Sequence, residues 1–319
     1  EMIPIPEIKE DEVLVKVQAV GLCGSDVSIV YGGYIKTSHN PITLGHEASG
    51  IIVKTGSKVG NWKPGDRVSI FPGVKCMECY NCRSGNEHRC TNAQTFGVHR
   101  DGALAEYIAV PERSLVSLPD DLPYTIGAII TDAVATPYHA LKNRAQLKEG
   151  DSVAIFGAGG LGMHAIQIAK LLGAGKIIAV DINEVQLKRA KEAGAHITIN
   201  AQLEDPVKRI REETNGQGVD VAGEFIGKKI TYDQTINSLR WGGTGVFVGI
   251  GPGPISVRPL KLIQKQLNLV GSIGFTIDTI SQLAELASKG KLQLEDSITH
   301  IFTLDEANKA LEYLRDKTD

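Results

Sequence analysis

The stretch DSVAIFGAGGLG, residues 151–162, decides the fold of this chain. Its apolar first half predicts a buried strand, and Gly157 opens the pattern G-x-G-x-x-G ahead of a predicted helix that runs to about Leu172. In this context the first glycine makes the turn, the second lets a pyrophosphate approach the backbone, and the third allows close packing of helix on strand. The helix N-terminus then faces the phosphates. The stretch therefore predicts a dinucleotide-binding unit, with these candidate binding residues: Gly157, Gly159, Gly160, Leu161 and Gly162.

An acidic residue follows at the distance that such a unit requires. A second predicted strand, residues 176–180, ends in Asp181, 19 residues beyond Gly162. A carboxylate there accepts hydrogen bonds from the ribose hydroxyls and repels a 2′-phosphate. Ile182 and Asn183 follow and bring no positive charge, so NAD is favoured over NADP. A compatible second role for Asp181 is to cap a predicted helix over residues 183–193.

Strands and helices alternate beyond this stretch, which predicts a parallel sheet. The expected strands are residues 196–200, 219–226, 244–250 and 267–273, and the expected helices between them include residues 205–214 and 232–239. Residues 134–275 are therefore expected to form a doubly wound α/β domain of the Rossmann type. The residues before them are rich in predicted strands, namely 12–20, 48–54 and 67–70.

The length and composition suit a globular protein of about two domains. A net charge of -3 and a hydrophobic fraction of 42% exclude disorder and argue against binding of nucleic acid or of a membrane surface through charge. The least polar stretch, residues 153–169, carries four glycines and two polar side chains and falls short of a membrane span. Because the N-terminal residues do not show the charged-then-apolar pattern of a secretory signal peptide, we expect a cytoplasmic enzyme.

Four of the five cysteines lie within fifteen residues, as Cys76, Cys79, Cys82 and Cys90. Their pattern, C-x2-C-x2-C-x7-C, favours a metal over disulfides, and four thiolates suit a closed tetrahedral zinc site with a structural role. An iron-sulfur cluster is the main alternative. Bacterial ferredoxins, however, have a last spacer of three residues followed by proline, whereas here it is seven residues followed by Thr91.

Three segments together resemble the zinc-dependent medium-chain alcohol dehydrogenases: residues 21–26 (GLCGSD), residues 45–50 (GHEASG) and the four-cysteine lobe. The resemblance covers essentially the whole chain. It implies a GroES-like, β-rich catalytic domain over residues 1–133 with a structural zinc lobe at 76–90. An NAD-binding Rossmann domain would follow over residues 134–275, and residues 276–319 would return to the catalytic domain.

The resemblance makes Cys23 and His46 ligands of a catalytic zinc. Residues 131–136 (TDAVAT) resemble the branch of the family in which the third ligand is aspartate, here Asp132, whose alternative role is to cap a helix that begins near Ala133. Three protein ligands and one open position let a metal polarise a carbinol oxygen. The expected metal content is therefore two zinc ions per chain, one catalytic and one structural.

The resemblance also assigns roles around this metal. Ser25 would accept the proton of the alcohol, and Asp26 would orient His46 through its second ring nitrogen. Glu47 would be a nearby carboxylate that sometimes moves onto the metal, and Thr136 would hold the nicotinamide from behind. The backbones of Gly249 and Ile250 would bind the carboxamide of the cofactor.

One position departs from the family pattern. Many members pass the proton towards solvent through a histidine where this chain has Ser28. Water, the ribose of the cofactor or His39 are the candidates to replace it. We expect the side chains that select the substrate to include Tyr31, Tyr34, His39 and Trp62.

The resemblance implies an NAD-dependent dehydrogenase that converts a primary or secondary alcohol into an aldehyde or ketone. A polyol, sugar or amino-alcohol dehydrogenase is the alternative, because residues 97–102 (GVHRDG) resemble those relatives, although these usually have glutamate as third ligand. Residues 132–138 also resemble dehydrogenases of cyclic hydroxyacyl-CoA substrates. A noncatalytic NAD(P)-binding relative is disfavoured because Cys23, His46 and Ser25 are all present.

The expected partners are a small-molecule substrate and further copies of the chain, in a tetramer or a dimer, with no nucleic acid and no membrane.

Overall fold

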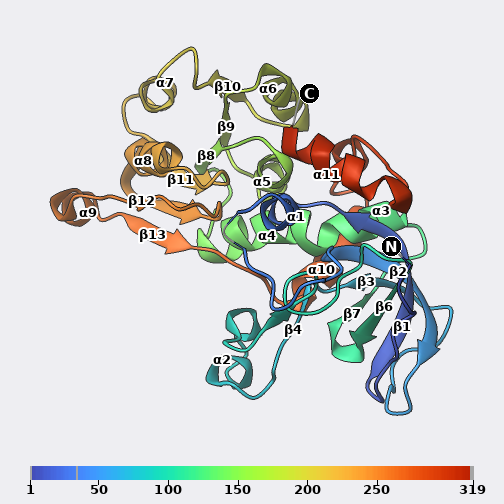
Figure 1. Ribbon diagram of the computed structural model, residues 1–319. Coiled ribbons are helices and arrows are strands. Elements are labelled where there is room, and N and C mark those ends of the chain that lie inside the picture. The colour runs from blue at the N-terminus through green and yellow to red at the C-terminus, as the bar shows by residue number, and fades with distance from the viewer. Residues whose placement is uncertain (1, 34, 317–319) are drawn as a thin grey trace. The chain divides into compact units, whose positions relative to one another are not determined.

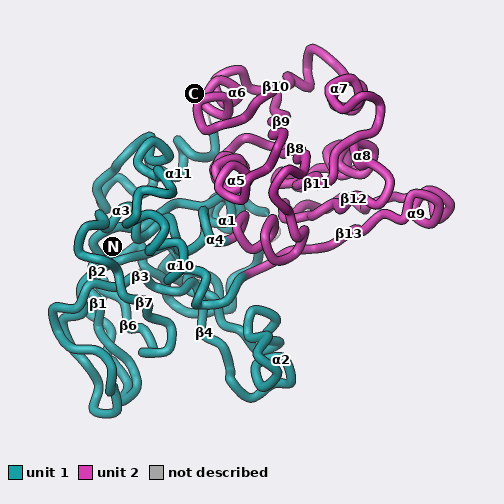
Figure 2. The backbone as a smooth tube through the Cα atoms, turned by 180° about the vertical axis from the view of Figure 1, so that it is seen from behind, with its two compact units in different colours: residues 1–135, 275–318 teal, residues 136–274, 319 magenta. Residues whose placement is uncertain are grey.

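The computed structural model describes residues 2–33 and 35–316 (Figure 1). The chain forms two compact units, which Figure 2 distinguishes by colour. Among the described residues, unit 1 contains 2–33, 35–135 and 275–316, and unit 2 contains Thr136–Gly274. Unit 1 is therefore built from both ends of the sequence, whereas unit 2 is one continuous stretch.

Within the described residues, unit 1 holds a five-stranded antiparallel sheet in the order β6-β1-β2-β3-β7. Its strands are β1 (Glu12–Gly21), β2 (Glu47–Thr55), β3 (Arg67–Ile70), β6 (Tyr107–Pro111) and β7 (Leu115–Ser117), and a small ribbon pairs β4 (Gly73–Val74) with β5 (Gln94–Thr95). The strands form because β-branched residues alternate along them. Val13, Val15, Ile52 and Val68 are fully buried in one core cluster. The expected strands near residues 12, 48 and 67 are all present.

The helices of unit 1 are short, apart from two that follow unit 2 in the sequence. They are α1 (Gly24–Val30), α2 (Tyr80–Arg83), α3 (Tyr124–Ile129), α10 (Ile277–Ser288) and α11 (Ala307–Asp316), with 3-10 turns η1 (Glu87–Arg89), η2 (Glu112–Ser114), η5 (Glu295–Ser297) and η6 (Leu304–Glu306). The segment from Phe275 is packed into this unit, because the ring of Phe275 meets that of Phe71 edge to face, with centroids 5.5 Å apart.

The helix that carries Asp132 begins earlier than expected. A start near Ala133 was predicted, but α3 begins at Tyr124, after Pro123, and the chain continues through a π-helical turn, η3 (Ile130–Val134). The reason is burial: the side chains of Ile126 and Ile130 are almost wholly buried, so tertiary packing extends the helix backwards. Asp132 consequently lies inside a helical segment and does not cap it.

In the described residues, unit 2 holds a six-stranded, fully parallel sheet in the order β10-β9-β8-β11-β12-β13. Its strands are β8 (Ser152–Phe156), β9 (Lys176–Asp181), β10 (Ile197–Asn200), β11 (Val219–Glu224), β12 (Leu239–Phe247) and β13 (Asn268–Gly271). Its helices are α4 (Ala135–Tyr138), which begins at the last residue of unit 1, the π-helical η4 (His139–Arg144), α5 (Gly160–Leu171), α6 (Glu184–Ala193), α7 (Pro206–Glu213), α8 (Lys229–Ser238) and α9 (Pro259–Lys265). This is the expected doubly wound α/β arrangement.

Two boundaries differ from the expected ones. The strand expected over residues 244–250 begins at Leu239, because this residue already pairs with Val219 ahead of a register shift. The preceding helix therefore ends at Ser238, before Leu239, and it begins at Lys229, earlier than the expected residue 232. The order of strands reverses between β8 and β11, and ligands of such sheets bind beyond the carboxyl ends of the strands at this point.

In the part of the chain that the structure describes, no helix combines the length and the apolar character needed to cross a membrane.

Candidate metal centres and cofactor-binding turn

Unit 1 brings four potential metal donors together from three separate segments. Cys23 directly precedes α1, His46 directly precedes β2, whose first residue is Glu47, and Asp132 projects from the π-helical turn η3. One donor atom from each lies within 4.8 Å of every other. Single π-helical turns occur frequently at functional sites, because the extra residue changes the direction of one side chain relative to the rest of the helix.

The distances between the donors fit a tetrahedral zinc ion. The Nε2 atom of His46 lies 3.5 Å from Oδ2 of Asp132, and Sγ of Cys23 lies 3.8 Å from the same oxygen. Bonds of about 2.0 to 2.3 Å to a tetrahedral zinc place neighbouring donors roughly 3.3 to 3.8 Å apart. The set contains one sulfur, one nitrogen and carboxylate oxygens, all of which zinc accepts.

Asp26 lies directly behind two of these donors. Its side chain is fully buried, and its Oδ2 atom accepts a hydrogen bond of 2.9 Å from the backbone N–H of Cys23. Its other oxygen faces Nδ1 of His46 at 3.6 Å. Ser25 lies on the opposite side of the ring, with its Oγ atom 3.4 Å from Nε2 of His46. Ser25 and Asp26 thus both lie next to the imidazole of His46, and for Asp26 this is the position that its predicted orienting role requires.

The carboxyl group of Glu47 occupies the space beside Gly21, which has no side chain. A Cβ atom on Gly21 would lie 2.3 Å from Oε2 of Glu47, so only glycine leaves room for this buried carboxyl group. Burial, followed by the negative charge of Asp132, raises the pKa of Glu47 to about 8. Burial also raises the pKa of the Cys23 thiol. Although burial lowers the pKa of His46, its hydrogen bonds to Asp132 and Asp26 outweigh this effect and raise it. Such a cluster holds protons that a divalent cation would displace.

The four-cysteine lobe forms a second donor cluster in unit 1. All four sulfur atoms lie within 4.8 Å of one another, with Cys76 3.4 Å from Cys90 and 3.9 Å from Cys82. The backbone N–H of Cys79 donates to the sulfur of Cys76 at 3.3 Å. Hydrogen bonds from the backbones of Cys82 and Thr91 lower the pKa of Cys79 to about 6, which favours the thiolate that zinc requires. With four cysteine donors, this cluster suits a closed metal site.

The glycine-rich turn after β8 has the shape of a phosphate cradle. Gly157 has a φ of +92°, a conformation that favours glycine. A Cβ atom on Gly162 would lie 1.7 Å from the carbonyl oxygen of Gly157, so helix α5 can pack against the turn only without a side chain there. At Gly160 an added Cβ would meet no atom within 4 Å, which leaves the start of α5 open to a ligand. The turn therefore fits a dinucleotide.

Asp181 contacts this turn directly. Its Oδ2 atom accepts a hydrogen bond of 2.7 Å from the backbone N–H of Ala158. Its Oδ1 atom accepts from the N–H groups of Ile182 and Asn183, at 2.7 and 3.0 Å. The proposed capping role belongs instead to Asn183, whose side chain accepts from the backbone of Val185 at the start of α6. The side chain of Ile182 is exposed and brings no charge to this edge.

The remaining candidates of unit 2 are Gly249, Ile250 and Thr136. Gly249 and Ile250 follow β12, and the N–H of Gly249 donates to the carbonyl oxygen of Glu224 at 3.1 Å. Thr136 is buried within α4.

Sequence reasoning missed Glu224, the last residue of β11, which is fully buried. The signal was present only as an acidic residue at the carboxyl end of a predicted parallel strand.

The structure also shows the surroundings of three further residues considered for proton transfer or substrate choice, Ser28, His39 and Tyr31. An added Cβ on Gly33 would lie 1.7 Å from Oγ of Ser28, so this hydroxyl is turned towards the Gly32-Gly33 turn. His39 is exposed, and its Nδ1 contacts the Oγ of its neighbour Ser38 at 2.9 Å. Tyr31 is exposed and packs its ring under the guanidinium of Arg315, 4.6 Å from the centroid. Tyr34 lies outside the described residues.

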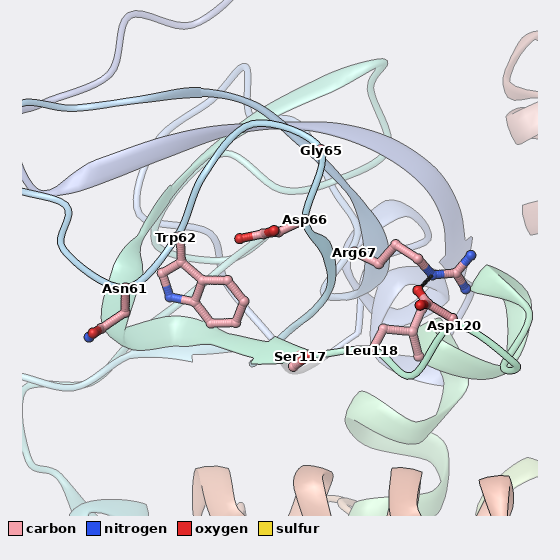
Figure 3. A pocket seen from close by; sticks show the side chains of 8 residues that line it. All are labelled: Asn61, Trp62, Gly65, Asp66, Arg67, Ser117, Leu118 and Asp120. Atoms are coloured by element: carbon pink, nitrogen blue, oxygen red, sulfur yellow. Dashed lines mark ion pairs between the residues drawn. The ribbon is translucent and has the colours of Figure 1, made fainter.

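Trp62 was expected among the side chains that select the substrate, and it lines a pocket whose described residues include none of the metal donors. This pocket, of about 480 Å³, lies beside β3 and β7, and none of the four donors around Cys23 is among the described residues that line it (Figure 3). Arg67 and Asp120 form an ion pair at its edge, with 3.8 Å between Nε and Oδ1. Trp62 is also packed against the core of the antiparallel sheet.

Comparisons with known proteins agree with this geometry. Residues 9–120 match the model of the alcohol dehydrogenase GroES-like domain, and residues 160–289 match that of the zinc-binding dehydrogenases. The chain is 35% identical over 317 residues to L-threonine 3-dehydrogenase of Bacillus velezensis, covering 98% of this chain and 91% of that protein. It is 34% identical over 316 residues to sorbitol dehydrogenase of Bacillus subtilis, covering 98% and 89%.

A solved structure is also similar. It is that of a zinc-binding dehydrogenase from Sinorhizobium meliloti bound to NADP, with a TM-score of 0.91, 32% identity and coverage of 97% of this chain and 90% of that chain. Sequence, metal donors and fold thus agree, and the chain belongs to the zinc-dependent medium-chain alcohol dehydrogenase family, whose members are NAD(P)-dependent oxidoreductases acting on CH–OH groups.

Proposed function

We propose that the protein oxidises the secondary alcohol of a polyol or an amino alcohol to a ketone, with NAD as hydride acceptor. The observation that carries the reaction type is the donor cluster of Cys23, His46, Glu47 and Asp132 with Ser25 beside it. The observation that favours this substrate class is the similarity, over 98% of the chain, to dehydrogenases of L-threonine and of sorbitol. Both substrates carry a second polar group next to the carbinol carbon.

Residues of unit 1 would have three separate roles in the oxidation of the alcohol: metal binding, proton transfer and positioning. Zinc held by Cys23, His46 and Asp132 would supply a Lewis acid that lowers the pKa of the carbinol. Ser25 is half-buried and lies beside His46, so its hydroxyl can receive the carbinol proton and pass it to solvent. Asp26 holds the imidazole and the backbone of Cys23 in place, and it acts as a positioning residue.

The preference for NAD rests on the edge beside Asp181. The glycine-rich turn would bind the pyrophosphate, and the Asp181 carboxylate would accept hydrogen bonds from the adenosine ribose. A 2′-phosphate brought to this carboxylate would be repelled, and the exposed Ile182 offers it no cation. The similar S. meliloti protein was solved with NADP, so this preference is a property to be tested on this chain.

A simple primary or secondary alcohol is the second candidate substrate. It is favoured by the third donor, Asp132, which resembles the alcohol dehydrogenase branch of the family. The test is a panel of L-threonine, sorbitol, xylitol, ethanol and 2-butanol with the zinc-loaded protein, assayed with NAD and with NADP. We expect kcat/KM for a polyol or for L-threonine to exceed that for both monoalcohols by at least about tenfold. Higher kcat/KM for the monoalcohols would support the second candidate instead.

We also propose two zinc ions per chain and a homo-oligomer. The first rests on the two donor clusters, which share no residue. The second rests on β13, which occupies an edge of the parallel sheet, and on the exposed apolar side chains of Trp241, Leu260 and Ile263 around it. Light scattering coupled to size-exclusion chromatography measures the molar mass, and a monomer would contradict the proposal.

A further inference from the structure

Glu224 holds two turns at the carboxyl edge of the parallel sheet. Its Oε1 atom accepts hydrogen bonds from the backbone N–H groups of Ile226 at 3.0 Å and Gly227 at 2.9 Å, and from the hydroxyl of Thr231 at 2.6 Å. Its carbonyl oxygen accepts from the N–H groups of residues 248 and 249, at 2.9 and 3.1 Å. One fully buried residue thus connects the turn after β11 with the turn after β12.

The two turns are packed backbone against backbone. Gly227 has a φ of +84°, and a Cβ atom added to it would lie 2.5 Å from the carbonyl oxygen of Ile250. A Cβ atom added to Gly251 would lie 1.6 Å from the carbonyl oxygen of Gly227. The position of Gly249 and Ile250 is therefore determined by the turn over residues 225–228.

The same turn contacts the glycine-rich turn on its other side. A Cβ atom added to Gly157 would lie 2.6 Å from Cγ1 of Ile226. The N–H of Phe225 donates to the carbonyl oxygen of Phe156 at 3.0 Å. The turn over residues 225–228 consequently lies between the turn that we assign to the pyrophosphate and the one that we assign to the carboxamide.

We propose that Glu224 is a positioning residue for the nicotinamide half of the cofactor. Its carboxyl group fixes the turn over residues 225–228, and this turn fixes the separation between Gly157 and Gly249. The inference rests on the proposed function, because it uses the assignment of these glycines to cofactor binding. It does not extend to the adenosine half, which we assign to Asp181 on the other side of the glycine-rich turn.

The second oxygen of Glu224 lies against the turn that carries Gly249. Oε2 has no hydrogen-bond partner among the described residues and lies 2.7 Å from the Cβ position of Gly249. Burial raises the pKa of Glu224, in spite of the hydrogen bonds from Thr231, Gly227 and Ile226. Tyr232 adds a second tether, since its hydroxyl donates to the carbonyl oxygen of Gly249 at 3.1 Å. Glutamine keeps the acceptor oxygen that receives the three hydrogen bonds, so it can replace Glu224 here.

The test compares the binding of NADH with that of AMP by titration calorimetry on the full, zinc-loaded chain. AMP probes the adenosine half alone. Glu224→Ala removes the acceptor of three hydrogen bonds, so we expect the Kd for NADH to rise by about tenfold or more while the Kd for AMP stays within about twofold. Glu224→Gln should stay within about threefold of the native protein for both ligands. An equal loss of NADH and AMP binding in Glu224→Ala, or no loss at all, would overturn the proposal.

Two further variants keep the outcome interpretable. Asp220 lies in the same strand β11, near its other end, where it accepts hydrogen bonds from Ser152 and Arg240. Asp220→Ala should lower thermal stability while leaving the ratio of the two Kd values unchanged. If Glu224→Ala does not fold, Thr231→Val tests the proposal in its place. This substitution removes one of the three hydrogen-bond donors to Oε1 of Glu224 with little change in side-chain shape. We expect it to weaken NADH binding about threefold to tenfold and to spare AMP, and an unchanged ratio would contradict the proposal.

The same titrations separate this inference from the proposed function. If the native protein binds neither NADH nor NADPH, the assignment of a cofactor site fails. If it binds NADH and the variants leave the ratio of Kd values unchanged, the cofactor site stands and the role of Glu224 fails. A steady-state measurement adds a second readout, since a positioning role predicts a rise in KM for NAD together with a lower kcat.

Discussion

The carboxylate of Asp181 accepts a hydrogen bond of 2.7 Å from the backbone N–H of Ala158, and thereby ties the end of β9 to the glycine-rich turn after β8. Asp181 therefore has a structural role in addition to the role in cofactor choice that we propose for it. Any substitution at this position changes both, and an experiment on cofactor preference has to separate them.

The double substitution Asp181→Gly with Ile182→Arg should move cofactor preference towards NADP. It removes a carboxylate that repels a 2′-phosphate and adds a cation at an exposed position. We expect the ratio of kcat/KM for NAD to that for NADP to fall by about a hundredfold or more, which corresponds to roughly 3 kcal/mol. The control is Asp181→Asn, whose amide oxygen can still accept from Ala158 but carries no charge. A native protein that prefers NADP would refute the assignment.

Metal analysis of the native protein should find two zinc ions per chain. Cys23→Ala and Asp132→Ala should each lose one zinc and keep the other, because the two donor clusters share no residue. Cys82→Ser should lose the zinc of the four-cysteine lobe and lower the melting temperature, since the loop between Cys76 and Cys90 has little apolar surface of its own. A native stoichiometry of one, or iron in the lobe, would contradict the assignment.

Ser25→Ala should lower turnover far more than it lowers zinc content. The Ser25 hydroxyl is assigned to proton transfer, and a positioned proton acceptor contributes about 10² to 10⁴-fold to the rate. Zinc content and turnover are measured on the same preparation, with Ser28→Ala as the control, because the Ser28 hydroxyl is turned towards Gly33. Full turnover of Ser25→Ala across the pH range would show that the proton reaches solvent without this hydroxyl.

Gly21→Ala should displace Glu47 and weaken the catalytic metal site. The added methyl group would lie 2.3 Å from Oε2 of Glu47. We expect a loss of about 1 to 3 kcal/mol in the free energy of unfolding and a lower occupancy of one zinc. Gly24→Ala is the matched control, because an added Cβ there meets no atom within 4 Å. Equal stability and zinc content in the two variants would show that Glu47 can be accommodated elsewhere.

The four-cysteine cluster could be predicted from its local spacing, whereas Cys23, His46 and Asp132 were predicted as ligands from the family resemblance. The four cysteines of the lobe span fifteen residues, and the strand that precedes the glycine-rich turn was evident from its apolar pattern. The helix around Asp132 was placed wrongly because its start depends on the burial of Ile126 and Ile130, which is a tertiary effect.

Glu224 shows a different limit of sequence reasoning. An acidic residue at the end of a strand is usually solvated, and nothing in its neighbours reveals that it is buried. It is buried because a turn distant in the sequence, at Gly249, packs over it. Trp62, which we expected among the side chains that select the substrate, packs against the core of the antiparallel sheet, a contact that depends on residues distant in the sequence.

The origin of unit 1 from both ends of the chain has a consequence for biosynthesis. During vectorial synthesis on the ribosome, all eight donors of the two metal clusters emerge before unit 2, and unit 2 can fold as soon as its own residues are complete. Helix α10, which packs against the π-helical turn that carries Asp132, emerges only afterwards. The four donors of the four-cysteine lobe are therefore all available before unit 2 is made, whereas the packing around Asp132, the proposed third zinc ligand, is completed only after unit 2 has been synthesised.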